Sequence, residues 1–140
     1  PEAHLVGQRP LLVTGSLRTN LTLGLETPPN DDALRSALDE VGLGDDSRAL
    51  AGGLDAPLGD DGFGLSAGQR ARLALARAIL SEAALVLLDE PTAHLDERSA
   101  GLAHNAIQRL ARTRSVVVVT HRPELVELAD AEVRLGGDRG

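Results

Sequence analysis

Two adjacent carboxylates, Asp89 and Glu90, directly follow an apolar run at residues 84–88. The run is continuous and not alternating, which is typical of a strand buried on both faces of a parallel sheet. Ligands of open α/β sheets bind beyond the carboxyl ends of the strands, so the pair lies where chemistry is expected. One carboxylate can hold Mg²⁺, directly or through water, and the other can orient or deprotonate an attacking water. An acidic turn after a buried strand is the structural alternative.

A second polar group, Ser66, Gly68 and Gln69, precedes an arginine-bearing helix predicted to run to Leu80. Ser66 and Gln69 have the S-x-x-Q spacing of a capping box, which by itself indicates only a well-capped helix. A helix N-terminus also presents free N–H groups and a positive dipole end, which suit a phosphate. Gly68 would let the backbone approach such a ligand closely. These residues alone leave both interpretations open.

Two further elements position the carboxylates. Residues 97–111 are predicted to form a helix with Asp96 as its N-cap, and residues 115–120 a second buried strand. The strand–helix–strand unit is expected to be right-handed with parallel strands. His121 ends the second strand, so it is expected near the carboxylate pair, although a histidine after a strand could equally lack a function. The fold class predicted from these elements is α/β with a parallel sheet.

The order and spacing of these segments resemble the ATP-binding domain of ABC (ATP-binding cassette) proteins. LSAGQ at 65–69 is similar to the family signature, usually written LSGGQ, with Ala67 in place of the usual glycine. Residues 85–89 are similar to the Walker B strand, and AHLD at 93–96 to the D-loop. The fold that this resemblance implies is a P-loop NTPase domain of the ABC type, with a parallel-sheet core and an α-helical subdomain.

The resemblance also implies roles for the residues. Asp89 would hold Mg²⁺, Glu90 would be the catalytic glutamate, and His121, in the family's H-loop, would contact the γ-phosphate and hold the glutamate and the water. ABC domains pair head to tail, so a second such domain is the implied partner, and each ATP lies between the Walker motifs of one domain and the signature of the other. The residues implied to contact that ATP from the signature and the D-loop are Ser66, Gly68, Gln69 and Asp96.

The N-terminal LVGQRP at 5–10 is predicted to be a short strand that ends before a proline, and it is similar to the family's Q-loop. The resemblance implies that Gln8 contacts Mg²⁺ and the attacking water and binds near the γ-phosphate of ATP. Residues 10–21, PLLVTGSLRTNL, resemble the exporter pattern in which this segment faces the coupling helices of a transmembrane domain. Ser16 is predicted to cap the short helix that follows.

All 14 basic residues are arginine, and a P-loop of the G-x-x-x-x-G-K-[ST] type needs its lysine. The chain therefore has no Walker A motif. The resemblance implies that residues 1–140 are the C-terminal part of one domain, incomplete at the N-terminus. Residues of about 15–82 would form the helical subdomain with the signature, and residues 1–14 and 83–140 parts of the catalytic core.

Composition excludes several classes of protein. The net charge of −7 argues against a broad nucleic-acid-binding surface, so nucleic acid is not an expected partner. Without cysteine there is no disulfide framework. No apolar run approaches the roughly 18 residues of a membrane span.

The remaining segments carry weaker predictions. Helices are expected at about 31–41 and 45–50, a loop at 51–54 and a short helix at 124–128. Residues 131–135 are expected to form a final strand, and His104 to be exposed. Asp60 takes the position of a glutamate found in many exporters before the signature; otherwise the segment is a flexible loop.

The function predicted is that of the ATP-binding and ATP-hydrolysing domain of an ABC exporter at the cytoplasmic face of the plasma (inner) membrane. The motif sequences PTAHLD, LSAGQR and VTHRP are most similar to those of thiol-reductant exporters of cytochrome bd assembly, which move cysteine or glutathione. One alternative is a soluble ABC-type ATPase of DNA repair or translation, although the interval from Gln8 to Ser66 is too short for a coiled-coil insertion. The other is a catalytically silent isolated piece.

Overall fold

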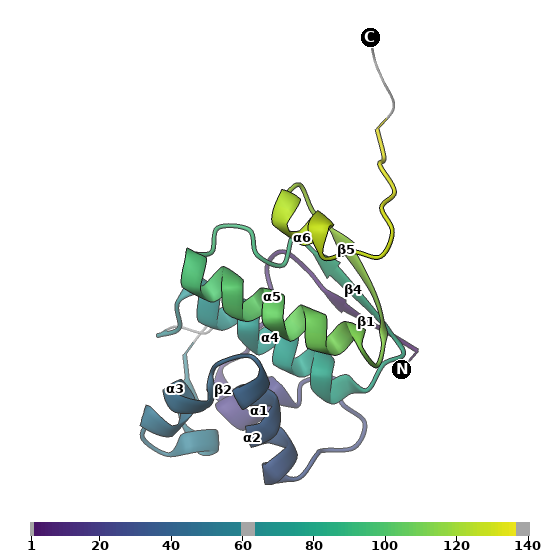
Figure 1. The fold of residues 1–140 in the computed structure, drawn as a ribbon. Helices are drawn as coiled ribbons and strands as arrows, with labels where there is room; N and C mark the ends of the chain where they lie inside the picture. The colour runs from purple at the N-terminus through teal and green to yellow at the C-terminus, as the bar shows by residue number, and fades with distance from the viewer. Residues whose placement is uncertain (1, 60–63, 137–140) are drawn as a thin grey trace.

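The computed structural model describes residues 2–59 and 64–136. Its centre is a parallel three-stranded sheet in the order β1–β4–β5, formed by β1 (Ala3–Val6), β4 (Leu85–Asp89) and β5 (Ser115–Val119) (Figure 1). Val6 pairs with Leu88, and Asp89 with Val119. The carboxyl ends of all three strands therefore meet at one edge, as the sequence predicts. The first strand lies earlier than the predicted residues 5–10.

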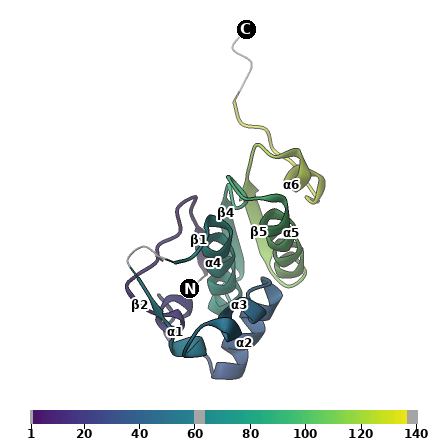
Figure 2. The ribbon, with the colours of Figure 1, turned by 90° about the vertical axis from the view of Figure 1, so that its left-hand side faces the viewer.

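Two long helices, α4 (Ala67–Ser81) and α5 (Glu97–Ala111), pack against each other and against the sheet. In Figure 2, α4 lies beside β1 and α5 beside β5. Side chains that point toward these helices, such as Val86 and Leu88, are buried. On β5, the side chains of Val117 and Val119 point away from these helices and are 50% and 59% exposed.

The predictions that β4 is buried on both faces and that β5 is a buried strand are therefore wrong. In the described residues helices cover one face only, so burial alternates along β4 and β5.

Shorter helices pack against α4 or against one another beside it. They comprise α1 (Leu17–Leu21), α2 (Asp31–Glu40), α3 (Gly44–Ala49) and a 3₁₀ helix at Gly53–Asp55. A two-residue antiparallel ribbon pairs β2 (Gly15–Ser16) with β3 (Pro57–Leu58). One continuous apolar core joins this helical part to the sheet, and its fully buried members include Leu21, Leu34, Leu38, Leu73, Leu75 and Leu88. The predicted loop at 51–54 thus overlaps a helical turn.

The predicted helix starts are confirmed by their capping bonds. Ser16, Asn30 and Asp96 each accept a hydrogen bond from the backbone N–H three residues later, at the starts of α1, α2 and α5. Such a bond satisfies one of the free N–H groups at a helix start and typically contributes about 1 kcal/mol. The short C-terminal helix α6 spans Pro123–Glu127.

Two predictions about the C-terminal third are wrong. Residues 131–135 form no strand, and Val133 and Leu135 are 83% and 91% exposed. A strand needs a hydrogen-bonded neighbour, and none of the described strands lies beside this segment. His104 is half-buried, and its Nε2 atom is fully buried without a hydrogen-bond partner among the described residues. The interpretation of Asp60 falls outside the described residues.

Helix α4 ends at Glu82, whose φ of 55° lies in the left-handed region. A residue with a Cβ is disfavoured there and glycine is not. We expect Glu82→Gly to raise the free energy of unfolding by about 1 kcal/mol. Thermal and urea denaturation measure the change. Glu127→Gly, at the end of α6 where φ is helical, is the control and should lower stability, and equal effects of both changes would contradict the prediction.

Candidate functional site at the strand ends and helix starts

The turns that follow the three parallel strands bring together Gln8, Asp89, Glu90 and His121, which we call the strand-end cluster. Asp89 is the last residue of β4, and each of the other three follows its strand by no more than two positions, so the shared sheet edge holds all four. Gln8 donates a hydrogen bond from Nε2 to Oδ1 of Asp89 at 3.4 Å. The expectation that His121 lies near the carboxylate pair is confirmed by its contacts with Glu90, and Gln8 lies beside Asp89.

The carboxylate of Glu90 is held firmly. Its backbone has a φ of 46°, and its N–H donates to the Val119 carbonyl at 2.8 Å, which extends the ladder between β4 and β5. Thr120 Oγ1 donates to Oε2 of Glu90 at 3.3 Å, and the His121 N–H donates to Oε1 at 3.0 Å. The Glu90 side chain is only 13% exposed as a result.

The imidazole of His121 is exposed, whereas the Glu90 carboxylate beside it is largely buried. Its Nε2 lies 3.7 Å from Oε1 of Glu90, yet the side chain is 99% exposed. The backbone of His121 thus orients Glu90, while the ring is free to contact a ligand outside the sheet edge. The φ of 46° at Glu90 lies in the left-handed region, which is unfavourable for a residue with a side chain and is often found at functional sites.

Mg²⁺ fits the donor set of the strand-end cluster. Mg²⁺ is commonly bound by one or two carboxylates together with waters and substrate phosphates. Asp89 offers one carboxylate and Gln8 one amide oxygen, and the two side chains are in contact. Groups of three or more metal-ligating side chains are absent from the described residues, so the phosphates and water would have to complete the coordination.

Ser66, Gly68, Gln69 and Asp96 form a second group, the helix-start cluster, at the beginnings of α4 and α5. The Ser66 N–H donates to Oε1 of Gln69 at 2.8 Å, and the Gln69 N–H donates to Oγ of Ser66 at 3.0 Å. This is the predicted capping box. Ser66 Oγ accepts in that bond, so its own hydrogen is still available to a phosphate oxygen. The structural and the ligand-binding interpretation are therefore compatible.

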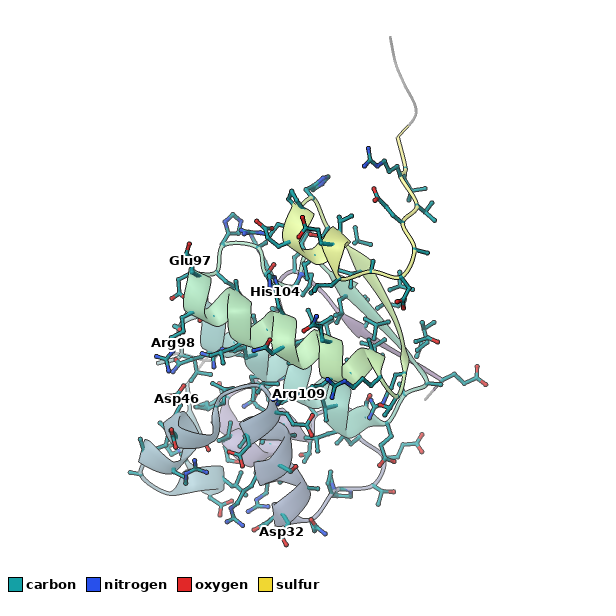
Figure 3. All side chains as sticks on the ribbon, in the orientation of Figure 1. Asp32, Asp46, Glu97, Arg98, His104 and Arg109 are labelled. Carbon is teal, nitrogen blue, oxygen red and sulfur yellow. The ribbon has the colours of Figure 1, made fainter. Side chains whose placement is uncertain are left out.

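Side chains from other elements border the helix-start cluster. Gln69 Nε2 donates to Oδ2 of Asp46, in α3, at 3.4 Å. Figure 3 shows Asp46 on the same side of the molecule as Glu97 and Arg98 at the start of α5. The loop of residues 90–96 connects this side to the strand ends, and in the described residues no hydrogen bond or ion pair joins the two clusters directly.

Gly68 is placed by helix packing. A Cβ at this position would lie 2.2 Å from Oγ and 2.6 Å from Cβ of Ser99, in the first turn of α5. The starts of α4 and α5 can approach this closely only if residue 68 has no side chain. The sequence-based argument for Gly68, close approach to a phosphate, missed this contact.

Arg72 fixes the start of α4 from the other side. Its Nε donates to the Gly68 carbonyl at 3.2 Å, and its Nη1 donates to the carbonyls of Val41 and Gly42 at 3.2 Å and 3.0 Å. The residue is 6% exposed, and this burial lowers the pKa of its guanidinium. The helix-start cluster is thus anchored to the end of α2.

Asp96 has a pKa below its usual value because its carboxylate accepts the Ser99 N–H at 2.7 Å. A lowered pKa in the folded state stabilises the protein above the unfolded-state pKa, and this stabilisation is lost as pH falls through the folded value. We expect Asp96→Asn, which still caps the helix, to flatten the loss of melting temperature between about pH 5 and pH 3. Melting curves across this range test the prediction, and identical slopes for both proteins would contradict it.

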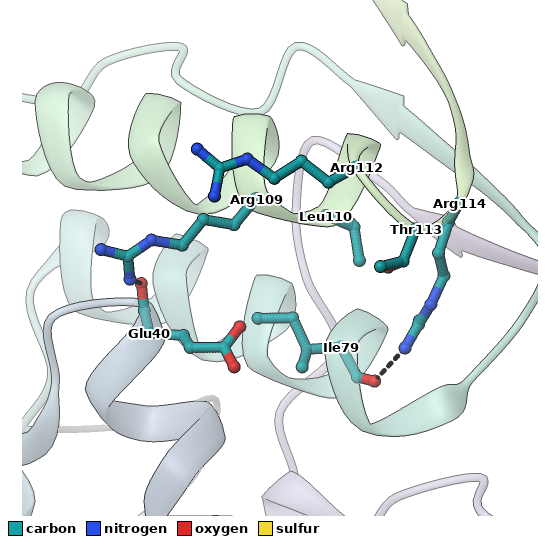
Figure 4. Close-up of a pocket in the computed structure, with 7 residues that line it drawn as sticks. All are labelled: Glu40, Ile79, Arg109, Leu110, Arg112, Thr113 and Arg114. Carbon is teal, nitrogen blue, oxygen red and sulfur yellow. Dashed lines mark hydrogen bonds between the residues drawn. The ribbon is translucent and has the colours of Figure 1, made fainter.

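A cavity of about 480 Å³ lies elsewhere, where α2, α4 and α5 end (Figure 4). Arg114 donates from Nη1 and Nη2 to the carbonyls of Ala78 and Ile79 at 2.7 Å and 2.6 Å, and Arg109 donates to the Glu40 carbonyl at 3.4 Å. These arginines satisfy free carbonyls at helix C-termini and oppose the negative dipole ends. No residue of either cluster lines this cavity, which therefore is not the candidate site.

The sequence did not single out several residues of the site. Thr120 contacts Glu90, Ser99 packs against Gly68, and Asp46 accepts a hydrogen bond from Gln69. Arg72 was identified only as part of an arginine-bearing helix. A serine at the third position of a helix, or a threonine before His121, is too common to be noticed alone. Only the contacts across elements identify them.

The family model described as "ABC transporter" matches residues 2–93. The chain belongs to the ABC transporter family.

Curated relatives agree with this membership. The chain is 38% identical over 140 residues to the ABC-type transporter kk1G of Curvularia clavata, covering 99% of this chain and 10% of that protein. It is 36% identical over 138 residues to an ATP-dependent lipid A-core flippase of Alkalilimnicola ehrlichii (99% and 23%). It is 39% identical over 125 residues to the glutathione/L-cysteine transport system ATP-binding/permease protein CydD of Haemophilus influenzae (89% and 21%). The chain thus spans less than a quarter of the length of each of these relatives.

A solved structure supports the fold. A bacterial Atm1-family ABC exporter with ATP bound superposes with a TM-score of 0.81 at 23% identity, covering 89% of this chain and 22% of that one. The α/β arrangement with a parallel sheet is therefore that of an ABC ATPase domain, as predicted from the sequence.

Proposed function

We propose that this chain is the ATP-binding and ATP-hydrolysing part of an ABC exporter. The observation that carries the proposal is the strand-end cluster, in which a carboxylate held by Thr120 and His121 lies beside the Gln8–Asp89 pair. A fixed carboxylate next to a metal-binding carboxylate is the arrangement that a metal-assisted phosphoryl transfer requires.

Each residue of the strand-end cluster has a separate role in this proposal. Asp89 and Gln8 would hold Mg²⁺, which neutralises charge on the transferring phosphoryl group. Glu90 would orient the attacking water and accept its proton. His121 would use its exposed ring to contact the γ-phosphate and would keep Glu90 in place through its backbone N–H.

The helix-start cluster would serve a second nucleotide. Ser66, Gly68, Gln69 and Asp96 have no direct bond to the strand-end cluster within the described part of the chain. We propose that they contact the ATP bound by a second ABC domain, paired head to tail with this one. The division of the chain into a helical subdomain of about 15–82 and core parts at 1–14 and 83–140 belongs to the same proposal.

An exporter is favoured over a soluble ATPase by the relatives. Two are described as transport proteins of lipid A-core and of glutathione or L-cysteine, and the superposed structure is an ABC exporter. We therefore propose a transmembrane domain as partner and a location at the cytoplasmic face of the plasma (inner) membrane. Within the described part of the chain, no helix combines the length and the hydrophobicity that a membrane span needs.

Thiols such as cysteine or glutathione are the substrate that we propose. This proposal is supported by the motif sequences PTAHLD, LSAGQR and VTHRP, which resemble those of thiol exporters, and by the CydD relative. A lipid substrate is the competing candidate, because lipid A-core flippases match over a similar length. Transport of labelled glutathione and of labelled lipid by the longer reading frame, where one exists, would discriminate between them.

A chimera tests the proposed function. The 138 residues of the Alkalilimnicola flippase that match this chain would be replaced by the chain, so that the host supplies the rest of its own protein. We expect ATP hydrolysis within tenfold of the host protein. Hydrolysis at background in a folded, membrane-inserted chimera would overturn the proposal.

The isolated chain should behave differently. It contains no lysine and thus no P-loop of the G-x-x-x-x-G-K-[ST] type to hold the β- and γ-phosphates. We expect millimolar Mg-ATP to leave its melting temperature unchanged, because a ligand stabilises only the protein that it binds. Differential scanning fluorimetry with Mg-ADP and Mg²⁺ alone as controls measures this, and a clear rise with Mg-ATP would contradict the argument from the missing lysine.

A further inference from the structure

Arg77, in the middle of α4, is a buried cation without a carboxylate partner. It is 7% exposed, and among the described residues no ion pair includes it. Burial lowers the pKa of its guanidinium to about 10. A buried charge is costly unless its hydrogen bonds are satisfied, so the polar contacts of Arg77 matter to the fold.

Arg77 makes these hydrogen bonds with a single residue, Asn20, which lies 57 positions earlier in the sequence. Arg77 Nε donates to the Asn20 backbone carbonyl at 2.5 Å, and Nη2 donates to Asn20 Oδ1 at 3.4 Å. Asn20 is itself completely buried. The pair therefore forms a polar link in an otherwise apolar interface between α1 and α4.

The amide of Asn20 also organises the segment before it. Its Oδ1 accepts the Val13 N–H at 2.8 Å, and its Nδ2 donates to the carbonyls of Val13 and Ser16 at 2.9 Å and 3.1 Å. These three bonds close residues 13–20 into a compact turn. Through Arg77, this turn is fixed to the signature helix.

The residues between β1 and this turn are held less tightly. Gln8, Arg9 and Leu11 are exposed, and the surroundings of Gly7 are open for 4 Å beyond its Cβ position. Leu12 is 4% exposed and belongs to the apolar core, so the less tightly held connection between β1 and the turn is limited to residues 7–11.

We propose that Arg77 and Asn20 form a buried clamp that fixes residues 13–21 to α4, so that this segment keeps its position relative to α4 and not relative to Gln8. The functional consequence rests on the proposed function above. A shift of the signature helix would then reach the segment that faces the membrane domain directly, without passing through Gln8.

Hydrogen exchange on the 140-residue chain tests the clamp. Arg77→Met removes the guanidinium and keeps an apolar chain in the core. We expect amide exchange in residues 13–22 to become at least tenfold faster, with α5 changed by less than twofold. Arg114→Met is the matched control, because Arg114 also donates two bonds to backbone carbonyls but links α4 to the start of β5. It should leave residues 13–22 within twofold of the wild type.

Two outcomes would overturn the clamp: unchanged exchange in residues 13–22, or an increase that is the same throughout the chain. If Arg77→Met does not fold, Arg77→Lys keeps the charge on a single donor nitrogen, and the expected local acceleration is two- to fivefold with the same comparison to α5. A uniform change in the lysine variant would equally reject the clamp.

The chimera separates this inference from the proposed function. There, Arg77→Lys should retain ATP hydrolysis within threefold and reduce transport at least tenfold, while Arg114→Lys changes both by less than threefold. Equal loss of hydrolysis and transport would reject the direct path to the membrane-facing segment. Failure of the unsubstituted chimera to hydrolyse ATP would reject the proposed function, and the exchange experiment would still decide the clamp.

Discussion

Glu90→Gln is expected to reduce ATP hydrolysis by the flippase chimera at least 100-fold while ATP binding is retained. A general base typically contributes a factor of about 10²–10⁴, and an amide cannot accept the proton of the attacking water. The substitution should not unfold the site, because the glutamine Oε1 can still accept the His121 N–H as Glu90 does at 3.0 Å. Single-turnover hydrolysis and equilibrium ATP binding, measured on the same preparation, separate chemistry from affinity.

Glu124→Gln provides the control for this change. Glu124 lies in α6, is exposed, and loses the same charge on substitution. Its hydrolysis rate should stay within twofold of the unsubstituted chimera. A Glu90→Gln variant that hydrolyses ATP at a rate near that of the control would show that Glu90 is not the base and would leave the strand-end cluster without its central role.

The second large effect concerns stability. In the 140-residue chain, Gly68→Ala should lower the free energy of unfolding by about 2 kcal/mol, because inserting a methyl group into a packed interface forces neighbouring elements to move. The added Cβ would stand 2.6 Å from Ser99 Cβ, an atom fixed to the backbone of α5, so rotation of the hydroxyl alone cannot relieve the clash. The expected fall in melting temperature is roughly 6–8 °C.

Gly101→Ala is the matched control for the glycine prediction. Gly101 lies within α5, and a Cβ there would meet no atom within 4 Å. The same chemical change should therefore stabilise the chain by about 0.5–1 kcal/mol, through helix propensity. Opposite signs for the two substitutions are the expected result.

A double-mutant cycle locates the cause. Combining Gly68→Ala with Ser99→Gly removes the opposing Cβ, so the loss should be smaller than the sum of the single effects. Additive losses would mean that Gly68 is required for a reason other than its contact with Ser99, such as the backbone approach to a phosphate that the sequence suggested.

Local elements were predictable from the sequence because neighbouring residues determine them. The S-x-x-Q spacing at Ser66 and Gln69 gave the capping box, and Asp96 gave the start of α5 at the right residue. The apolar runs at 84–88 and 115–119 gave two parallel strands, and the turns after them gave the meeting of Glu90 with His121. These predictions needed only periodicity, capping chemistry and the rule that parallel strands end at one edge.

The burial of the strands and the conformation of residues 131–135 could not be predicted from local sequence patterns. A continuous run of valines has the same composition whether one face of the sheet is covered or both, and the coverage depends on which helices pack there. Similarly, residues 131–135 have the pattern of a strand, but a strand forms only beside a hydrogen-bonded neighbour.

The identity and order of the chemical groups follow from the sequence: the carboxylate pair, the glutamine and histidine that follow their strands, and the polar helix start. The tertiary structure alone decided which groups support them. The contacts of Gly68 with Ser99, of Glu90 with Thr120 and of Arg77 with Asn20 join residues 30 or more positions apart. Such contacts depend on how whole elements pack, and no local pattern encodes that packing.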